Sequence, residues 1–131
     1  MNIMDKFSLK GKKAIVTGGA RGLNHGMAEG LHEAGAEVVL FDIMDLVYES
    51  AEKMSTPEAP VHAVKGDVTD KESREKAFAE AIELLGGRLD ILINGAGIQY
   101  RCEAIDFPED KFKQILDVNL VGLFYMAQLA A

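Results

Sequence analysis

The sequence predicts an α/β fold: a doubly wound parallel sheet, incomplete because the chain holds its first four strands and their helices. Three observations lead to this class, and the first is that short apolar runs alternate with stretches of helical spacing along the 131 residues, as in βαβ units. The runs are continuously apolar, which is typical of strands covered on both faces. A glycine-rich turn also joins the first run to the first helical stretch. We expect the strand order 3-2-1-4 and one unit, residues 1–131, that forms the N-terminal, cofactor-binding part of a single domain.

The first strand is expected over residues 13–17, a continuous apolar run that follows a polar lead-in. A helix follows from about Leu23 to Ala34, before a glycine that is a natural stop. Because Met27, Leu31 and Ala34 fall at helical spacing, we expect them to form the buried face of this helix.

The middle of the chain continues the alternation. A second strand is expected over residues 37–42, a short helix over residues 45–54 and, after a loop with two prolines, a weaker third strand over residues 61–65. A capping-box pattern predicts a helix from Thr69, its cap, to Leu85. The apolar face of this helix comprises Ala77, Phe78, Ala81, Ile82 and Leu85. A fourth strand is expected over residues 90–94.

A long helix is expected to start near Phe107 and to occupy residues 108–131. Asp106 can cap it, and Pro108 suits its first turn. The second half of this helix is apolar on more than one face. One apolar face can pack on the sheet, so the other needs a further partner to shield it from water. We therefore expect a homo-oligomer with this helix in the contact.

Composition narrows the class of protein. Hydrophobic residues make up 48% of the chain, and the formal net charge is −7. The charge argues against nucleic acid or an anionic membrane as partner, because both bind basic surfaces. The single cysteine, Cys102, excludes an internal disulfide, and the histidines lack metal-ligand spacing, so no metal is expected. No stretch reaches the roughly 18 apolar residues of a membrane span, and no signal peptide is evident, which favours a soluble cytoplasmic protein.

The turn after the first strand is a candidate phosphate site. Gly18 and Gly22 let the backbone curl tightly and approach a pyrophosphate, and the helix that follows directs its N–H groups and the positive end of its dipole to the same point. We expect Arg21 and Leu23 to border this site. The third small position of the pattern is Asn24, whose side chain takes up space beside the phosphates. The alternative is a helix start that binds no ligand.

Asp42 ends the second expected strand and follows Gly22 at about the spacing of a ribose-binding carboxylate, roughly 20 residues. A carboxylate there accepts hydrogen bonds from the adenosine ribose hydroxyls and repels the extra phosphate of NADP. The sequence therefore favours NAD as cofactor. Arg21 favours NADP weakly, since a cation pairs with that phosphate. The alternative for Asp42 is a turn residue that caps the next helix.

Four motifs together resemble the short-chain dehydrogenase/reductase family, over nearly the whole chain. They are Thr17-Gly18-x-x-x-Gly22, Asp67-Val68, Asn94-Gly95-Ala96-Gly97 and Asn119. The resemblance implies a Rossmann-type fold and hydride transfer between a nicotinamide cofactor and an alcohol or ketone. It also implies that Asp67 and Val68 hold the adenine. The residues that would line the ribose side are Asn94, Ala96 and Gly97.

The resemblance further implies that Asn119 holds a proton-relay water. Each of these residues also has a structural interpretation: Asp67 as a helix cap, although Thr69 is better placed, and Asn94 as the end of a strand. Asn119 has apolar neighbours on both sides, which suggests a covered position where an amide needs partners.

The sequence departs from the family's pattern at three places. Asn24 stands where glycine is usual, and Gly95 replaces the second asparagine of Asn-Asn-Ala-Gly, which removes an amide that steadies the central sheet. The family's catalytic Ser and Tyr-x-x-x-Lys pair have no counterpart, because none of the tyrosines precedes a lysine by four positions. We therefore expect the 131-residue chain alone to be inactive.

The segment from Gly97 to Arg101, with Phe107-Pro108-Glu109, is similar to the sugar-acid dehydrogenases of this family, the gluconate dehydrogenases among them. Arg101 follows the expected cofactor loop, where a guanidinium can pair with a substrate carboxylate. The alternative is a surface arginine that balances Glu103 and Asp106.

Three hypotheses on function follow from these residues. The leading one is the NAD-binding part of an oxidoreductase that acts on an alcohol or ketone, with a sugar acid as a candidate substrate. The second is a non-catalytic NAD-binding or dimerisation module that pairs through the long helix, and the third is a remnant that binds nothing.

Overall fold

The four strands form one parallel sheet in the order β3-β2-β1-β4, as the sequence predicts. They are β1 (Lys13–Thr17), β2 (Glu37–Asp42), β3 (Val61–Lys65) and β4 (Ile91–Ile93). The computed structural model describes all residues, 1–131. Strand β1 lies between β2 and β4, so that Val16 pairs with Leu40 on one side and with Ile93 on the other. Because the strands are parallel, their carboxyl ends lie at one edge, where the loops after them meet.

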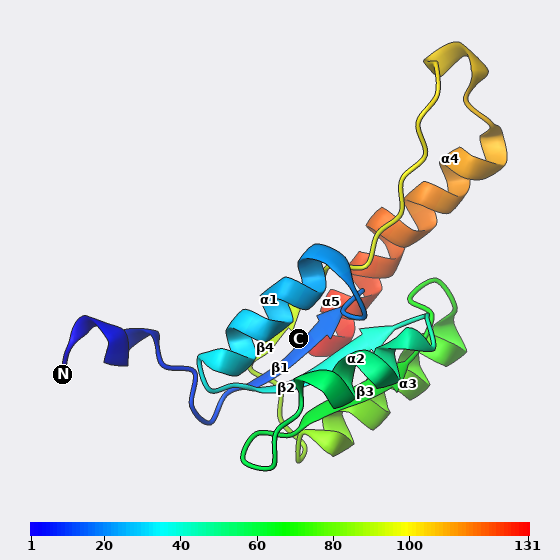
Figure 1. Cartoon of the computed structure of the whole chain (residues 1–131). Helices are drawn as coiled ribbons and strands as arrows, with labels where there is room; N and C mark the ends of the chain where they lie inside the picture. Colours follow the sequence, from blue (N-terminus) through cyan, green and yellow to red (C-terminus); the bar gives the residue numbers. More distant parts are fainter.

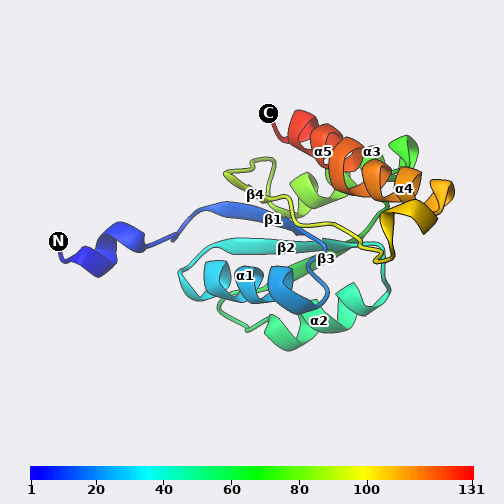
Figure 2. The same cartoon turned by 90° about the horizontal axis from the view of Figure 1, so that it is seen from above.

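Helices cover both faces of the sheet (Figure 1 and Figure 2). Helices α1 (Gly22–Glu33) and α2 (Leu46–Met54) lie on one face, and α3 (Lys71–Leu84) and α5 (Leu123–Ala130) lie on the other. Alternate strand residues fill the two cores: Val16 and Leu40 point to α1 and α2, whereas Ile15 and Phe41 point to α3 and α5. Each such side chain contributes roughly 1.5–3 kcal/mol when fully buried. This double cover explains the continuous apolar runs.

Helix α1 meets the sheet with part of the predicted face: Leu31 packs against the core, but Met27 does not. Ala28 is its one fully buried residue, whereas Met27 is 44% exposed. The tight turn before the helix fixes its rotation, and at that rotation a methyl group is what fits against the sheet. The expectation that Met27 lies in the core is therefore wrong, and its neighbour Ala28 takes that place.

Helix α3 buries the predicted apolar face, with Ala77, Ala81 and Leu85 fully inside the core. Its cap differs from the prediction. The Asp70 carboxylate accepts a hydrogen bond from the Ser73 N–H at 2.9 Å, which makes Asp70 the N-cap in place of Thr69.

The predicted helix over residues 108–131 is one column of three segments. They are α4 (Glu109–Leu116), the π-helical segment η3 (Asp117–Gly122) and α5. Asp106 does not cap this column: it lies in the short 3-10 segment η2 (Ala104–Asp106), and Pro108, with an extended backbone, takes the N-cap position. In Figure 1, α4 and the loop before it extend beyond the sheet.

The outer surface of this column keeps apolar side chains in contact with water. Met126 is its one fully buried side chain and attaches α5 to the sheet, whereas Leu120 is 63% exposed and Phe124 is 61% exposed. Exposed apolar side chains that lie together often mark a contact surface, and the predicted homo-oligomer stays a prediction. The 3-10 helix η1 (Ile3–Phe7) also lies exposed, away from the sheet (Figure 1). None of the helices combines the length and apolar character that a membrane crossing requires.

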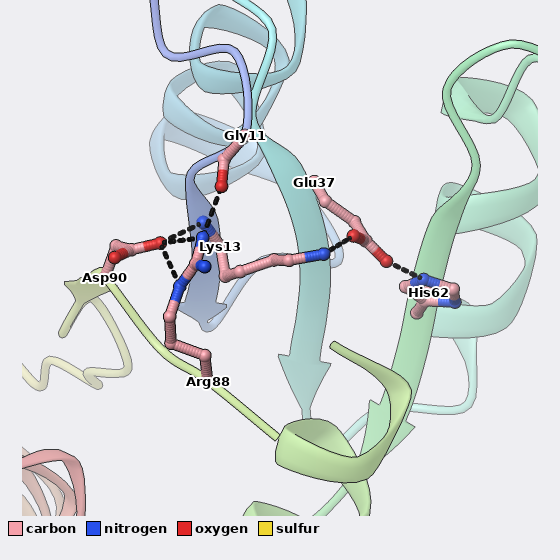
Figure 3. A network of polar contacts seen from close by, with 6 residues as sticks. All are labelled: Gly11, Lys13, Glu37, His62, Arg88 and Asp90. Carbon is pink, nitrogen blue, oxygen red and sulfur yellow. Dashed lines mark hydrogen bonds and ion pairs between the residues drawn. The ribbon is translucent and has the colours of Figure 1, made fainter. Parts of the chain in front are cut away.

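Charged side chains join the amino-terminal ends of three strands (Figure 3). Lys13 of β1 donates through its Nζ to the Glu37 carboxylate of β2, and the Nε2 of His62 in β3 donates to the same carboxylate at 2.9 Å. Burial alone raises the pKa of Glu37, but the hydrogen bonds and charges of Lys13 and His62 outweigh it and leave this pKa below the ordinary value of 4.5. Glu37 is therefore held as a carboxylate at the centre of the group.

A second carboxylate extends this network to the start of β4 (Figure 3). The Asp90 carboxylate accepts from the backbone N–H of Lys13 at 2.8 Å and from the Arg88 guanidinium at 3.1 and 3.2 Å. Arg88 also donates to the Gly11 carbonyl. The backbone hydrogen bond from Lys13, assisted by Arg88, holds the pKa of Asp90 below its ordinary value. All four strands are thus tied at the end opposite to the loops described next.

The Glu37 contacts predict a pH dependence of stability. Because the pKa of Glu37 is lower in the folded chain than in the unfolded one, its contribution is present above the unfolded pKa and is lost as the pH falls through the folded pKa. We expect Glu37→Gln to lower the free energy of unfolding at pH 7 by about 1 kcal/mol and to flatten the loss of stability between about pH 5 and pH 3. Urea unfolding across this pH range measures both effects. Glu52→Gln, which removes an exposed carboxylate without a partner on α2, is the control, and equal effects of the two variants would contradict the prediction.

Candidate functional site

The glycine turn after β1 lies against the loop after β4. Gly18 and Gly22 have φ angles of +66° and +69°, in the left-handed region that favours glycine. A Cβ atom on Gly18 would lie 3.1 Å from the Cα atom of Ala96, so this glycine also permits the close approach of the two loops. A Cβ on Gly22 would meet open space, so its backbone conformation alone requires glycine there.

The start of α1 presents free backbone donors. Arg21 is the N-cap with an extended backbone, and no side chain accepts a hydrogen bond from the first amides of the helix. The side chains of Arg21 and Leu23 are exposed beside these amides. Uncapped amides at the positive end of a helix dipole form a site for an anionic group. The Gly18-to-Leu23 segment therefore has the properties of a phosphate cradle.

The Asp42 carboxylate, at the end of β2, holds the turn in place. One of its oxygens accepts from the Ala20 N–H and the other accepts from the Met44 N–H, each at 3.0 Å. Asp42 is 7% exposed, and a carboxylate has lone pairs left after two such bonds. The N-cap of α2 is Asp45. Asp42 therefore does not cap that helix, and it lies beside the cradle as an acceptor at the strand tip.

Thr17 is a residue that the sequence analysis did not single out for a role. Its hydroxyl oxygen accepts from the N–H groups of Gly95 at 2.9 Å and of Ala96 at 3.1 Å, and its side chain is fully buried. A hydroxyl at the end of a buried apolar strand needs such partners, and this is the signal that could have identified it. Thr17 thus joins the ends of β1 and β4. Gly97, next along this loop, is exposed.

The Asp67-Val68 pair forms the loop between β3 and α3. The Asp67 carboxylate accepts from the backbone N–H and the hydroxyl of Thr69, at 2.9 and 2.7 Å, and so shapes the loop without capping the helix. The Val68 side chain is buried in the core, and its carbonyl accepts from Arg74 at 2.8 Å. Arg74 is itself buried and lies over the ring of Tyr125. The side chain of Val68 is therefore not available to a ligand, and its carbonyl already accepts a hydrogen bond from Arg74.

The two asparagines of the expected site make backbone contacts with the helical column and the loop before it. The Nδ2 of Asn94 donates to the Leu123 carbonyl at 2.7 Å, whereas its Oδ1 is buried without a partner. Asn119 lies in η3 and pairs with both backbone groups of Ile98, each at 2.8 Å. Asn119 is exposed, so the covered position expected from its apolar neighbours is wrong, although the amide does have partners.

Arg101 stands apart from the cradle. It lies in the loop that leads to α4, is exposed, and forms no hydrogen bond or ion pair, including with Glu103 or Asp106. Its guanidinium is therefore free to meet a ligand carboxylate. Two surface hollows, of about 390 and 480 Å³, lie along α3 and include no residue of the glycine turn. The structure gathers no group of three His, Cys, Asp or Glu side chains that could hold a metal ion.

The chain is similar in sequence to several known proteins. A family described as short chain dehydrogenase matches residues 12–131. The chain is 36% identical to the 2-dehydro-3-deoxy-D-gluconate 5-dehydrogenase of Dickeya dadantii, covering 98% of this chain and 50% of that protein. It is 40% identical to the NAD-dependent glycerol dehydrogenase of Listeria innocua, covering 94% of this chain and 47% of that protein.

Solved structures with the same fold include a relative of this kind. A short-chain type dehydrogenase/reductase from Mycobacterium marinum superposes with a TM-score of 0.91 at 30% identity, covering 99% of this chain and 53% of that one. The chain thus spans about half the length of the relatives that it matches.

Proposed function

Because the chain belongs to the short-chain dehydrogenase family, we propose that it is the NAD-binding part of an oxidoreductase that transfers hydride between NAD(H) and an alcohol or ketone. One observation carries the proposal: the uncapped start of α1 lies beside a buried carboxylate at the tip of β2. The amides of Gly22 and Leu23 suit the diphosphate, and Asp42 suits the ribose hydroxyls next to it. Bound there, the nicotinamide supplies the hydride acceptor or donor.

The preference for NAD over NADP rests on Asp42. Its carboxylate is nearly buried and is fixed by two backbone N–H groups. It therefore cannot swing away from a phosphate on the adenosine ribose, which it would repel. Arg21 is exposed and favours NADP only weakly. The Listeria relative, named as NAD-dependent, supports the same choice.

The remaining cofactor contacts come from loops at the same edge of the sheet. We assign the adenine side to Asp67 and Val68, and the ribose side to Asn94, Ala96 and Gly97. The Nδ2 of Asn94 also holds the end of β4 against α5. Asn119 would act on the proton relay from η3, since a π-helical segment often marks a functional site.

The substrate class is proposed from Arg101 and from the relatives. A free guanidinium suits a carboxylate, and the Dickeya relative is named for a sugar acid. We therefore favour a sugar acid over a simple alcohol or ketone. None of the chain's tyrosines forms the Tyr-x-x-x-Lys pair that works with the family's catalytic serine. Catalysis therefore requires residues that this chain does not supply, and we propose that the 131-residue chain alone is inactive.

Assembly and location complete the proposal. The exposed apolar side chains of the α4–η3–α5 column, such as Leu120 and Phe124, fit a contact between two copies of the protein. The one cysteine, Cys102, is a free exposed thiol, which fits the reducing cytoplasm. A dimerisation module that binds NAD without catalysis would share these features, and activity of the complete protein separates the two.

The cofactor choice is tested by calorimetric titration of the chain with NAD and with NADP. We expect NAD to bind about tenfold more tightly or better, and Asp42→Asn to narrow that ratio because the repelling charge is gone. Asp45→Asn removes a carboxylate three positions away that pairs with Lys65 at the surface, and it should leave the ratio unchanged. Tighter binding of NADP by the parent chain would overturn the assignment of Asp42.

The substrate class is tested in a protein of the relatives' full length, in which we propose that the added half carries the catalytic segment. Arg101→Ala should raise the KM for a sugar acid by about tenfold, because a charge-assisted pair is lost, and should leave the KM for NAD unchanged. Arg88→Ala, which removes an arginine at the opposite end of the sheet, is the matched control. An unchanged KM for the sugar acid in Arg101→Ala would remove this residue from the site.

A further inference from the structure

Two residues far apart in the sequence, Asn24 and Gly95, share one small volume between the start of α1 and the loop after β4. The Nδ2 of Asn24 donates to the Gly95 carbonyl at 2.7 Å. A Cβ atom on Gly95 would lie 2.3, 2.4 and 2.7 Å from the Oδ1, Cγ and Nδ2 atoms of Asn24. Side chains do not approach one another this closely, so the amide of Asn24 occupies the space that a side chain at position 95 would need.

The backbone does not explain why residue 95 is glycine. Gly18 and Gly22 have positive φ angles, but Gly95 does not, so its backbone conformation is open to other residues. The three atoms nearest to its missing Cβ all belong to Asn24. Asn24 therefore makes the closest clashes that a side chain at this position would meet.

The amide of Asn24 also touches the glycine turn. A Cβ on Gly18 would lie 2.9 Å from the Nδ2 of Asn24. On the other side, the N–H of Gly95 donates to the Thr17 hydroxyl. Gly95 is thus held at its carbonyl by Asn24 and at its N–H by Thr17. These two bonds set the distance between the phosphate cradle and the loop from Gly95 to Gly97.

We propose that Asn24 is a positioning residue for the cofactor loop and that Gly95 is its obligatory steric partner. The pair is reciprocal: an asparagine at position 95 opposite a glycine at position 24 would place its amide in the same volume. Binding groups must be held within about 0.5 Å of the geometry that suits the ligand. One amide that bridges the two loops can hold them in this way. The coupling of the two residues stands on the contacts alone, whereas the effect on NAD rests on the proposed function.

The coupling is tested by a double-mutant cycle of Asn24→Ala and Gly95→Ala, read as the midpoint of thermal unfolding. We expect Gly95→Ala to lower the midpoint by about 4 °C or more in the parent chain, and by less than half as much when Asn24 is alanine. If Gly95→Ala alone gives no folded protein, recovery of a cooperative transition in the double variant reports the same coupling. Equal shifts in the two backgrounds, or no recovery, would overturn the pairing.

The positioning role is tested by calorimetric titration with NAD. Asn24→Leu keeps the branched, uncharged shape but loses the donor, and we expect its dissociation constant for NAD to rise about fivefold or more. Asn24→Gly should bind weakly too, and Asn24→Gly with Gly95→Asn should regain most of the lost affinity. Parent-like affinity in Asn24→Leu, or no rescue by the reciprocal pair, would refute the role. If the parent chain does not bind NAD, the proposed function and this role fail together, and the thermal cycle alone decides the coupling.

Discussion

The hydrogen bonds from the ends of β2 and β1 to the neighbouring loops, buried at Asp42 and partly buried at Thr17, are the constraint on which the site depends. Asp42 holds the Ala20 N–H, and Thr17 holds the N–H groups of Gly95 and Ala96. A buried bond to a charged acceptor contributes about 1.5–3 kcal/mol, and leaving its donor without a partner costs a similar amount. The loops after β1, β2 and β4 therefore behave as one rigid rim. Because the Asp42 side chain holds the turn through the Ala20 N–H, the amides at the start of α1 stay free for a ligand.

The two ends of the sheet are held by different chemistry. At the amino-terminal ends of the strands, partly exposed charges such as Lys13, Glu37 and Asp90 form a network that responds to pH and salt. At the carboxyl ends the bonds are buried or partly buried, so solvent screens them less. This division suits the proposed function, since the end proposed to bind the cofactor keeps its geometry while surface charges titrate at the far end.

The sequence predicted the sheet well and the contacts across it poorly. Strands covered on both faces leave continuous apolar runs, so the strand order and nearly all strand bounds could be read directly. On α1 the sequence predicted Leu31 correctly but placed Met27 in the core where the structure has Ala28, because the turn sets the rotation of the helix. Asn24 and Gly95 looked like two separate departures from a family pattern, yet they are in contact across 71 positions. Thr17 was missed for the same reason, because Gly95 and Ala96, its partners, are distant in sequence.

The most direct test of the account is to locate bound NAD on the chain by NMR. A ¹⁵N-labelled sample titrated with NAD reports each backbone amide separately. We expect the largest shift changes on the glycine turn and the first turn of α1, residues 18–24, with smaller changes over residues 95–97. Changes centred on the surface hollows along α3, with none in the glycine turn, would contradict it.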